Sequence, residues 1–307
     1  STRKESSAAS DVYKRQAFLR YLKSEKNYSK HTVRAYSKDI KDFAVHCSNT
    51  YDLHNLEKVH YNMLRDYIIE LSKRGLAMRS INRKCSALKS LYSYFQKIGV
   101  IEAHPFAQHK AVKAKKTFIT PFSLTELKAV IEQIDRSDFV GLRDATAIEL
   151  LYGTGIRQAE LIGLKISDID WAQGHIRVLG KQNKERLIPL LPSLANTLKL
   201  YLEQREAYSR MSAHSFLLIT NKGNKTYPAF LYRLIKTYFR GVSNKIITSP
   251  HVLRHSFATH MLDAGADINV VKEILGHESL AATQEYTKVQ LPKLQDAYRA
   301  AHPRAKK

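Results

Sequence analysis

The chain has 307 residues, more than one small domain needs, and its length predicts two domains. Its 50 Lys and Arg residues outnumber 28 Asp and Glu residues, which gives a formal net charge of +22. An excess of this size favours a polyanionic partner, nucleic acid first. A hydrophobic share of 44% and a charged share of 25% exclude a wholly disordered chain. No apolar run approaches the roughly 18 residues that a membrane-spanning helix needs.

The two cysteines, Cys47 and Cys85, lie far apart among apolar neighbours. They indicate reduced core residues, not a disulfide framework or a zinc site. Residues 1–16 are polar and charged without a hydrophobic period, so we expect a flexible tail and no signal peptide there. Together these features predict a cytoplasmic protein.

Residues 17–102 carry a helical pattern in about four segments, the second of which follows a candidate cap at Ser29. On the fourth segment four basic residues lie away from the apolar stripe: Arg79, Arg83, Lys84 and Lys89. A solvated cationic face would explain them. The total charge favours instead a helix that faces DNA.

Residues 103–118 contain a proline and several lysines but no sustained apolar period, which predicts a basic linker along a phosphate backbone. The charge excess is shared by both halves. Residues 1–112 hold 21 Lys and Arg against 10 Asp and Glu, and residues 113–307 hold 29 against 18, so each half carries +11. Nucleic-acid contacts are therefore expected from both.

The second half, residues 119–307, opens with a capping-box pattern, Ser123 to Glu126, before a helical stretch that ends at Gly153 and Gly155. Strands at 175–179 and 186–190 predict a hairpin. A short strand is expected at 216–219. Further helices are expected at 194–208, 229–240, 251–264, 267–275, 279–286 and 291–301.

Phosphate-binding loops, nucleophile elbows and zinc-protease helices have no match in the sequence. His251, His255 and His260 are close in sequence, but their spacings of four and five do not put all three on one face of a helix. We therefore expect neither a metal nor another cofactor.

A set of six residues carries the chemistry instead. Each has an ordinary structural explanation when taken alone, such as an ion pair between Arg157 and Glu160 or a packed tyrosine ring. Together they supply cations for nonbridging oxygens, an acid for a leaving group and a nucleophile, which is what metal-free phosphoryl transfer requires. The six are Arg157, Lys181, His251, Arg254, His277 and Tyr286.

The strings that contain these residues resemble the signature boxes of the tyrosine recombinases of the phage-integrase family. They are GTGIRQAELIGLKISDID, GKQNKERLIPL, HVLRHSFATHML and LGHESLAATQEYT. The likeness is greatest to the bacterial Xer (XerC/XerD) subgroup, and it runs from about residue 17 to the C-terminus. It implies a mainly α fold: a helical, SAM-like core-binding domain at 17–102 and an α+β catalytic domain at 119–307 with a small antiparallel sheet.

By this resemblance Arg157 and Arg254 clamp the phosphate, and Tyr286 is the nucleophile. His251 is the candidate base, Lys181 the acid for the 5′ oxygen, and His277 a donor to a nonbridging oxygen. Glu160 would support Arg157, or have a plain structural role. Further DNA contacts are expected from the hairpin residues Lys184 and Arg186.

The resemblance implies a site-specific recombinase that cleaves and rejoins double-stranded DNA through a 3′-phosphotyrosine and a Holliday junction. Four protomers would act on two sites, with the chain itself or a paralogue as partner and a DNA translocase as a further candidate partner. An Xer-like role in chromosome dimer resolution is favoured. The alternatives are a mobile-element integrase or invertase, a topoisomerase, and a non-catalytic DNA-binding regulator on this scaffold.

Two features bear on regulation. The last helix, 291–301, has one apolar side that could fold back on its own domain, and the resemblance favours docking on a neighbouring protomer. Glu278 and Glu285 place carboxylates next to His277 and Tyr286, where they would repel a phosphate or point outward.

Overall fold

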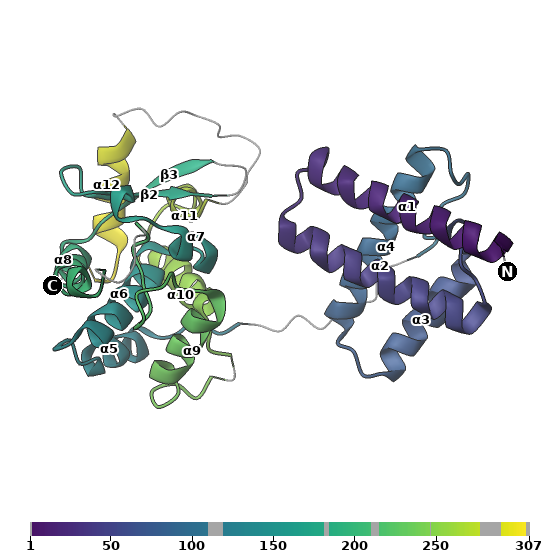
Figure 1. The fold of residues 1–307 in the computed structure, drawn as a ribbon. Coiled ribbons are helices and arrows are strands. Elements are labelled where there is room, and N and C mark those ends of the chain that lie inside the picture. The colour runs from purple at the N-terminus through teal and green to yellow at the C-terminus, as the bar shows by residue number, and fades with distance from the viewer. Residues whose placement is uncertain are drawn as a thin grey trace. The chain divides into compact units, whose positions relative to one another are not determined.

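The computed structural model describes residues 2–109, 119–180, 184–209, 215–245, 247–276 and 290–304. The chain divides into two compact units, Ser1–Thr117 and Phe118–Lys307. Figure 1 draws the helices and strands of the two units, and each unit has a hydrophobic core of its own. Among the described residues, no helix is long and apolar enough to cross a membrane.

The first unit is a group of helices around an aromatic and aliphatic core. Its elements are α1 (Thr2–Ser24), α2 (Lys30–Tyr51), a 3-10 turn (Leu56–Lys58), α3 (Tyr61–Lys73) and α4 (Met78–Lys97). The predicted cap at Ser29 is confirmed, because its side chain accepts a hydrogen bond from the Thr32 amide at the start of α2. The buried residues include Phe18, Phe43 and Phe95, and Cys47 and Cys85 are free thiols among them.

The start of the chain differs from the expected tail. Residues 2–16 lie in α1, and the Asp11 carboxylate on this helix is buried, accepting a hydrogen bond from the Leu56 amide. Because this part of α1 is held by polar contacts, its sequence lacks the apolar period by which a helix is recognised. The expected linker also begins later than residue 103, since Phe106 is buried in the core of the first unit.

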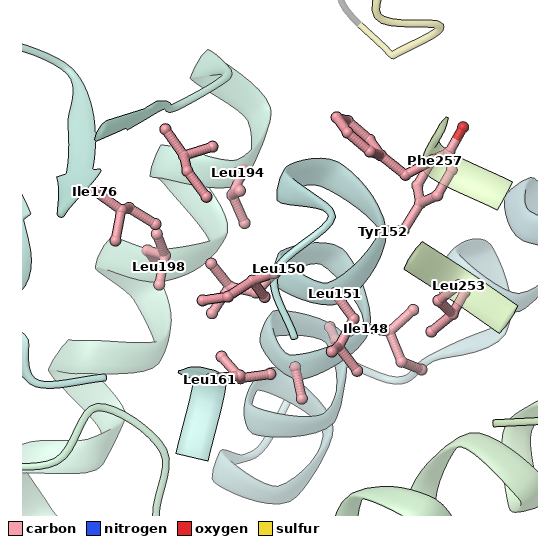
Figure 2. Packing of buried hydrophobic residues seen from close by; sticks show 14 of the residues in the cluster. Ile148, Leu150, Leu151, Tyr152, Leu161, Ile176, Leu194, Leu198, Leu253 and Phe257 are labelled. Carbon is pink, nitrogen blue, oxygen red and sulfur yellow. The ribbon is translucent and has the colours of Figure 1, made fainter. Parts of the chain in front are cut away.

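The second unit surrounds the helix α6, in which every residue except Val140 is buried. Its elements are α5 (Leu124–Gln133), α6 (Phe139–Thr154), α7 (Gln158–Gly163), a 3-10 turn (Ile166–Asp168), β1 (Ile169–Asp170), β2 (His175–Leu179), β3 (Glu185–Pro189), α8 (Pro192–Ser209), α9 (Pro228–Phe239), α10 (Pro250–Asp263), α11 (Ile268–Leu275) and α12 (Gln290–Ala301). Figure 2 shows Leu150 of α6 beside Leu194 and Leu198 of α8, with Leu151 and Ile148 of α6 on the side of Leu253 of α10. The capping box of Ser123 and Glu126 is confirmed.

The sheet is antiparallel, in the order β1-β2-β3. The predicted hairpin is confirmed, with Val178 paired to Arg186 and Arg177 to Leu187. The expected strand at 216–219 is wrong: Phe216 and Ile219 form single bridges to other segments. The expected helix at 279–286 lies outside the described residues.

The last helix packs on its own unit. α12 contacts α11 and β3, and the buried Tyr298 hydroxyl donates to the Gly153 carbonyl oxygen. The amide of Gln295 also donates to the Gln173 carbonyl oxygen at 2.9 Å. In this structure α12 therefore folds back on its own unit, and docking of this helix on a neighbouring protomer stays a prediction.

Candidate active site

The turn after α6 places the first site residue. Gly155 ends α6 with a φ of 59°, and a Cβ atom there would lie 2.5 Å from Phe257 and 2.7 Å from Leu275. Only glycine combines this backbone conformation with so close an approach. Arg157 follows two residues later and precedes the first residue of α7.

The Glu160 carboxylate binds both the backbone amide and the guanidinium of Arg157. The Arg157 backbone amide donates to Glu160 Oε2 at 2.9 Å, and its Nη1 donates to Oε1 at 2.7 Å. Arg157 Nη2 reaches the carbonyl oxygen of Gly276 at 2.8 Å. The sequence allowed two interpretations of Glu160, support for Arg157 or a plain structural role. In the structure its carboxylate contacts the Arg157 guanidinium directly.

Arg254, on α10, lies almost wholly inside the protein, with 7% of its surface exposed. Its Nη1 donates to the Gly155 carbonyl oxygen and its Nη2 to the Leu275 carbonyl oxygen, both at 2.6 Å. Burial and the neighbouring positive charge of Arg157 lower its pKa to about 10, against the opposing effect of Glu160. The guanidinium stays charged at neutral pH, in a place where an anion would stabilise it.

Arg186, on β3, is also buried, which corrects the expectation of a DNA-contacting residue. Its Nη2 and Nη1 donate to the two carboxylate oxygens of Glu160 at 2.7 and 3.1 Å. Its Nε donates to the Ile274 carbonyl oxygen at 2.8 Å. This guanidinium is committed to the protein interior, and the neighbouring Lys184 is exposed as expected.

These contacts converge on the end of α11. Its last carbonyl groups lack partners within the helix. Ile274, Leu275 and Gly276 each present a carbonyl oxygen to one of the arginines 186, 254 and 157. In the part of the chain that the structure describes, one carboxylate lies close to the three guanidiniums: Glu160, which binds Arg157 and Arg186. Among the described side chains the cluster therefore carries surplus positive charge, and it is suited to an anion.

Lys181, His277 and Tyr286 lie outside the described part of the chain, but the residues directly before Lys181 and His277 are described. Lys181 follows Gly180, whose Cβ position lies 3.8 Å from Glu160 Oε1 and 3.7 Å from Arg186 Nη1. His277 follows Gly276, whose carbonyl oxygen accepts from Arg157. Both neighbours border the arginine cluster. Tyr286 is outside the described residues.

His251 is the second residue of α10, one helical turn before Arg254, and is exposed. Partial burial lowers the pKa of its imidazole, and the positive charge of Arg254 and the neighbouring His255 lower it further. A lowered pKa favours the neutral ring, the state in which it can accept a proton. His260, the third histidine of this helix, hydrogen-bonds the Tyr152 hydroxyl through Nδ1 at 3.1 Å.

The basic residues of α4 divide into exposed and neutralised ones. Arg79 and Lys89 are exposed. Lys84 is buried, which corrects the expectation that it faces away from the core, and its ammonium donates to Asp39 at 3.0 Å and Asp42 at 2.7 Å. Arg83 is exposed, but its guanidinium pairs with the buried Asp39 as well.

Asp39 is a residue that the sequence analysis missed. A signal was present, since Asp39 lies three residues after Tyr36 and four before Phe43, within the apolar stripe of α2. A carboxylate at such a position requires a cationic partner.

In the described residues no three His, Cys, Asp or Glu side chains form a group that could hold a metal ion.

Both units of the chain are similar in sequence to known proteins. The Phage integrase family model matches residues 117–291, and its N-terminal SAM-like domain model matches residues 16–97. The tyrosine recombinase XerC of Oceanobacillus iheyensis is 36% identical over 291 residues, which cover 94% of this chain and 95% of that protein. The tyrosine recombinase XerD of Halalkalibacterium halodurans is 31% identical over 291 residues, covering 94% and 97%.

A solved structure is similar over both units too. The crystal structure of the XerH site-specific recombinase bound to difH substrate, a pre-cleavage complex, matches with a TM-score of 0.65 and 25% identity, covering 91% of this chain and 83% of that one. The chain therefore belongs to the phage integrase family of tyrosine recombinases and is a site-specific recombinase of that class.

Proposed function

We propose that the chain cleaves and rejoins DNA through a 3′-phosphotyrosine on Tyr286. The observation that carries the proposal is the arginine cluster, in which buried Arg254 and half-buried Arg157 are oriented by backbone carbonyls with surplus positive charge. A scissile phosphodiester is an anion, and the pentacovalent transition state carries more negative charge on its nonbridging oxygens. Oriented donors stabilise that state most.

Arg157 and Arg254 hold the nonbridging oxygens in this mechanism. Each guanidinium has five N–H donors. Two of the five are occupied by described partners in Arg157, and two in Arg254. The remaining donors have no partner among the described residues, and in this mechanism they bind phosphate oxygens. Because the carbonyl contacts are already made, binding DNA requires little further ordering of these side chains.

Proton transfers complete the reaction. Tyr286 loses its phenol proton to His251 as its oxygen attacks phosphorus, and the bond from phosphorus to the 5′ oxygen breaks. Lys181 donates a proton to that oxygen, giving a 5′-hydroxyl, while His277 donates a hydrogen bond to a nonbridging oxygen. The phosphotyrosine keeps the phosphodiester energy, so a second 5′-hydroxyl can attack it and release the tyrosine without ATP.

The biological role that fits best is Xer-like resolution of chromosome dimers in the cytoplasm. Support comes from the XerC and XerD relatives, each similar over nearly the whole chain. Four protomers, of this chain alone or with a paralogue, would exchange strands between two DNA sites through a Holliday junction. A DNA translocase is a candidate activating partner. A mobile-element integrase or invertase of the same family is the alternative role.

Sequencing the DNA that the protein traps covalently tests this proposal. Protein is expressed in its own host, covalent complexes are isolated under denaturing conditions, and the attached DNA is sequenced. We expect enrichment of one chromosomal site. Enrichment of the ends of a mobile element would replace dimer resolution with integration, and absence of any covalent complex would favour a non-catalytic DNA-binding protein.

A further inference from the structure

Arg186 has the contacts of a residue that organises the site without reaching its substrate. It is the second residue of β3, pairs with Val178 across the hairpin, and has 5% of its surface exposed. Its three described hydrogen bonds run to both oxygens of Glu160 and to the carbonyl of Ile274. A guanidinium so enclosed has no face for DNA.

We infer that Arg186 is a positioning residue, which fixes the Glu160 carboxylate and the end of α11 and thereby sets where Arg157 and Arg254 lie. The inference rests on the proposed function for its effect on cleavage. Its structural part stands on the contacts alone. Arg186 acts through two routes, one electrostatic and one through the backbone.

The first route is Glu160. Arg157 and Arg186 bind the same two carboxylate oxygens, so loss of Arg186 removes half of the partners that hold the carboxylate. Burial raises the pKa of Glu160, but the hydrogen bonds and charge of Arg186, followed by those of Arg157, outweigh it and lower the pKa below its usual value. The described charged groups that face Glu160 are these two arginines and, farther off, Arg254.

The second route is the end of α11. Arg186 Nε binds the Ile274 carbonyl oxygen, and the same side chain lies beneath Gly276, where a Cβ atom would be 3.2 Å from its Cδ and Nη1. The next two carbonyls of this helix end, those of Leu275 and Gly276, orient Arg254 and Arg157. A shift of this helix end would therefore move both arginines.

Lysine cannot replace Arg186 in this position. The planar guanidinium presents Nη1 and Nη2 to two carboxylate oxygens and Nε to a carbonyl in one rigid geometry. A lysine has one nitrogen at the end of a flexible chain, and it would keep the charge without the three directed bonds. Arg186→Lys therefore separates geometry from charge.

The experiment compares Arg186→Lys and Arg186→Gln in the full-length chain with two control variants. Arg177→Gln removes an exposed arginine from the neighbouring strand β2, and Arg136→Gln breaks a partly buried ion pair with the buried Glu149 outside the cluster. For each, the single-turnover rate of covalent adduct formation is measured at saturating DNA, beside the Kd for DNA and the melting temperature. We expect Arg186→Lys to cleave about 10- to 100-fold more slowly, with its Kd for DNA within about threefold of the parent's.

A second readout does not depend on cleavage. The pKa of Glu160 is measured by NMR of carboxyl-labelled glutamate, with Glu160→Gln as the assignment control. We expect Arg186→Gln to raise this pKa and Arg136→Gln to leave it unchanged. If Arg186→Gln does not fold, Arg186→Lys takes its place and should raise the pKa by a smaller amount.

The outcomes separate the two claims. Parent-like cleavage by Arg186→Lys, a weakened Kd as the main effect, or a loss no greater than that of Arg136→Gln at matched melting temperature would overturn the positioning role. An unchanged pKa of Glu160 would overturn it as well. If the parent itself forms no adduct, the proposed function fails, and the pKa of Glu160 still decides whether Arg186 positions this carboxylate.

Discussion

Arg254 donates a 2.6 Å hydrogen bond to the carbonyl oxygen of Gly155, 99 positions earlier in the chain. Gly155 also begins the turn that leads to Arg157, so the same turn positions both arginines proposed to bind phosphate. The Tyr298 hydroxyl of α12 binds the carbonyl two residues earlier, at Gly153. The geometry of the site therefore depends on three segments that are distant in sequence.

Gly155→Ala tests the turn. The φ of 59° strains any other residue, and the new methyl group would meet Phe257. We expect a loss of about 3 kcal/mol or more in the free energy of unfolding, the sum of backbone strain and overpacking, together with loss of cleavage. Gly174→Ala is the matched control, because its φ is 63° and nothing lies within 4 Å of the added atom. Chemical denaturation measures both, and equal losses would show that the contact with Phe257 is unimportant.

Arg254→Lys and Arg157→Lys test the need for a planar cation. A lysine keeps the charge but has a single nitrogen on a flexible chain, so it lacks the two fixed nitrogens that Arg254 directs at Gly155 and Leu275. We expect each variant to form adduct about 100-fold more slowly or worse, while gel-shift assays show DNA binding retained. Near-parental rates from either lysine variant would mean that only charge is needed there.

The basic face of α4 predicts different results for neighbouring residues. Arg79→Ala and Lys89→Ala remove exposed charges. Each should weaken binding to all sequences and flatten the dependence of log Kd on log salt by about one unit, if it contacts a phosphate. A base contact would instead relax specificity at one position. If neither changes, this face is ordinary solvated surface.

Lys84→Met on the same helix should act on stability. The substitution leaves the buried Asp39 with one cationic partner and removes a partner of Asp42. We expect a loss of roughly 2 to 4 kcal/mol in the free energy of unfolding, measured by chemical denaturation, and an unchanged salt dependence of DNA binding. A flattened salt dependence would mean that Lys84 leaves its carboxylates for DNA.

The pH dependence of cleavage tests His251. Burial, Arg254 and His255 lower the pKa of this imidazole below 6.5. The base must be neutral, so the rate should be constant near pH 7 and fall as pH decreases through that lowered pKa. His251→Gln should cleave slowly and lose this acid limb. Single-turnover rates from pH 5 to pH 8 measure it, and an acid limb that persists in the variant would assign the titration to another group.

Much of the fold could be predicted because it depends on local pattern. The Ser29 cap, the capping box at Ser123 and the hairpin of β2 and β3 each depend on residues close in sequence. The residues whose surroundings were predicted wrongly have partners that are distant in sequence. The hairpin position of Arg186 predicted a DNA contact, but in the fold this residue is buried and bonded to Glu160 and Ile274. Lys84 was expected to be exposed, but its partners lie on α2. Periodicity says which face is apolar and does not say which charges meet across it.

The most direct test uses a nicked suicide duplex, which traps the covalent complex because the cleaved fragment diffuses away. Parent protein and Tyr286→Phe are incubated with cognate DNA in EDTA and separated on a denaturing gel. The variant lacks only the phenol oxygen, so we predict parental DNA binding and no adduct, whereas the parent forms an adduct without metal. An adduct of normal yield in Tyr286→Phe, or a parent that cleaves only after Mg²⁺ is added, would contradict the proposed mechanism.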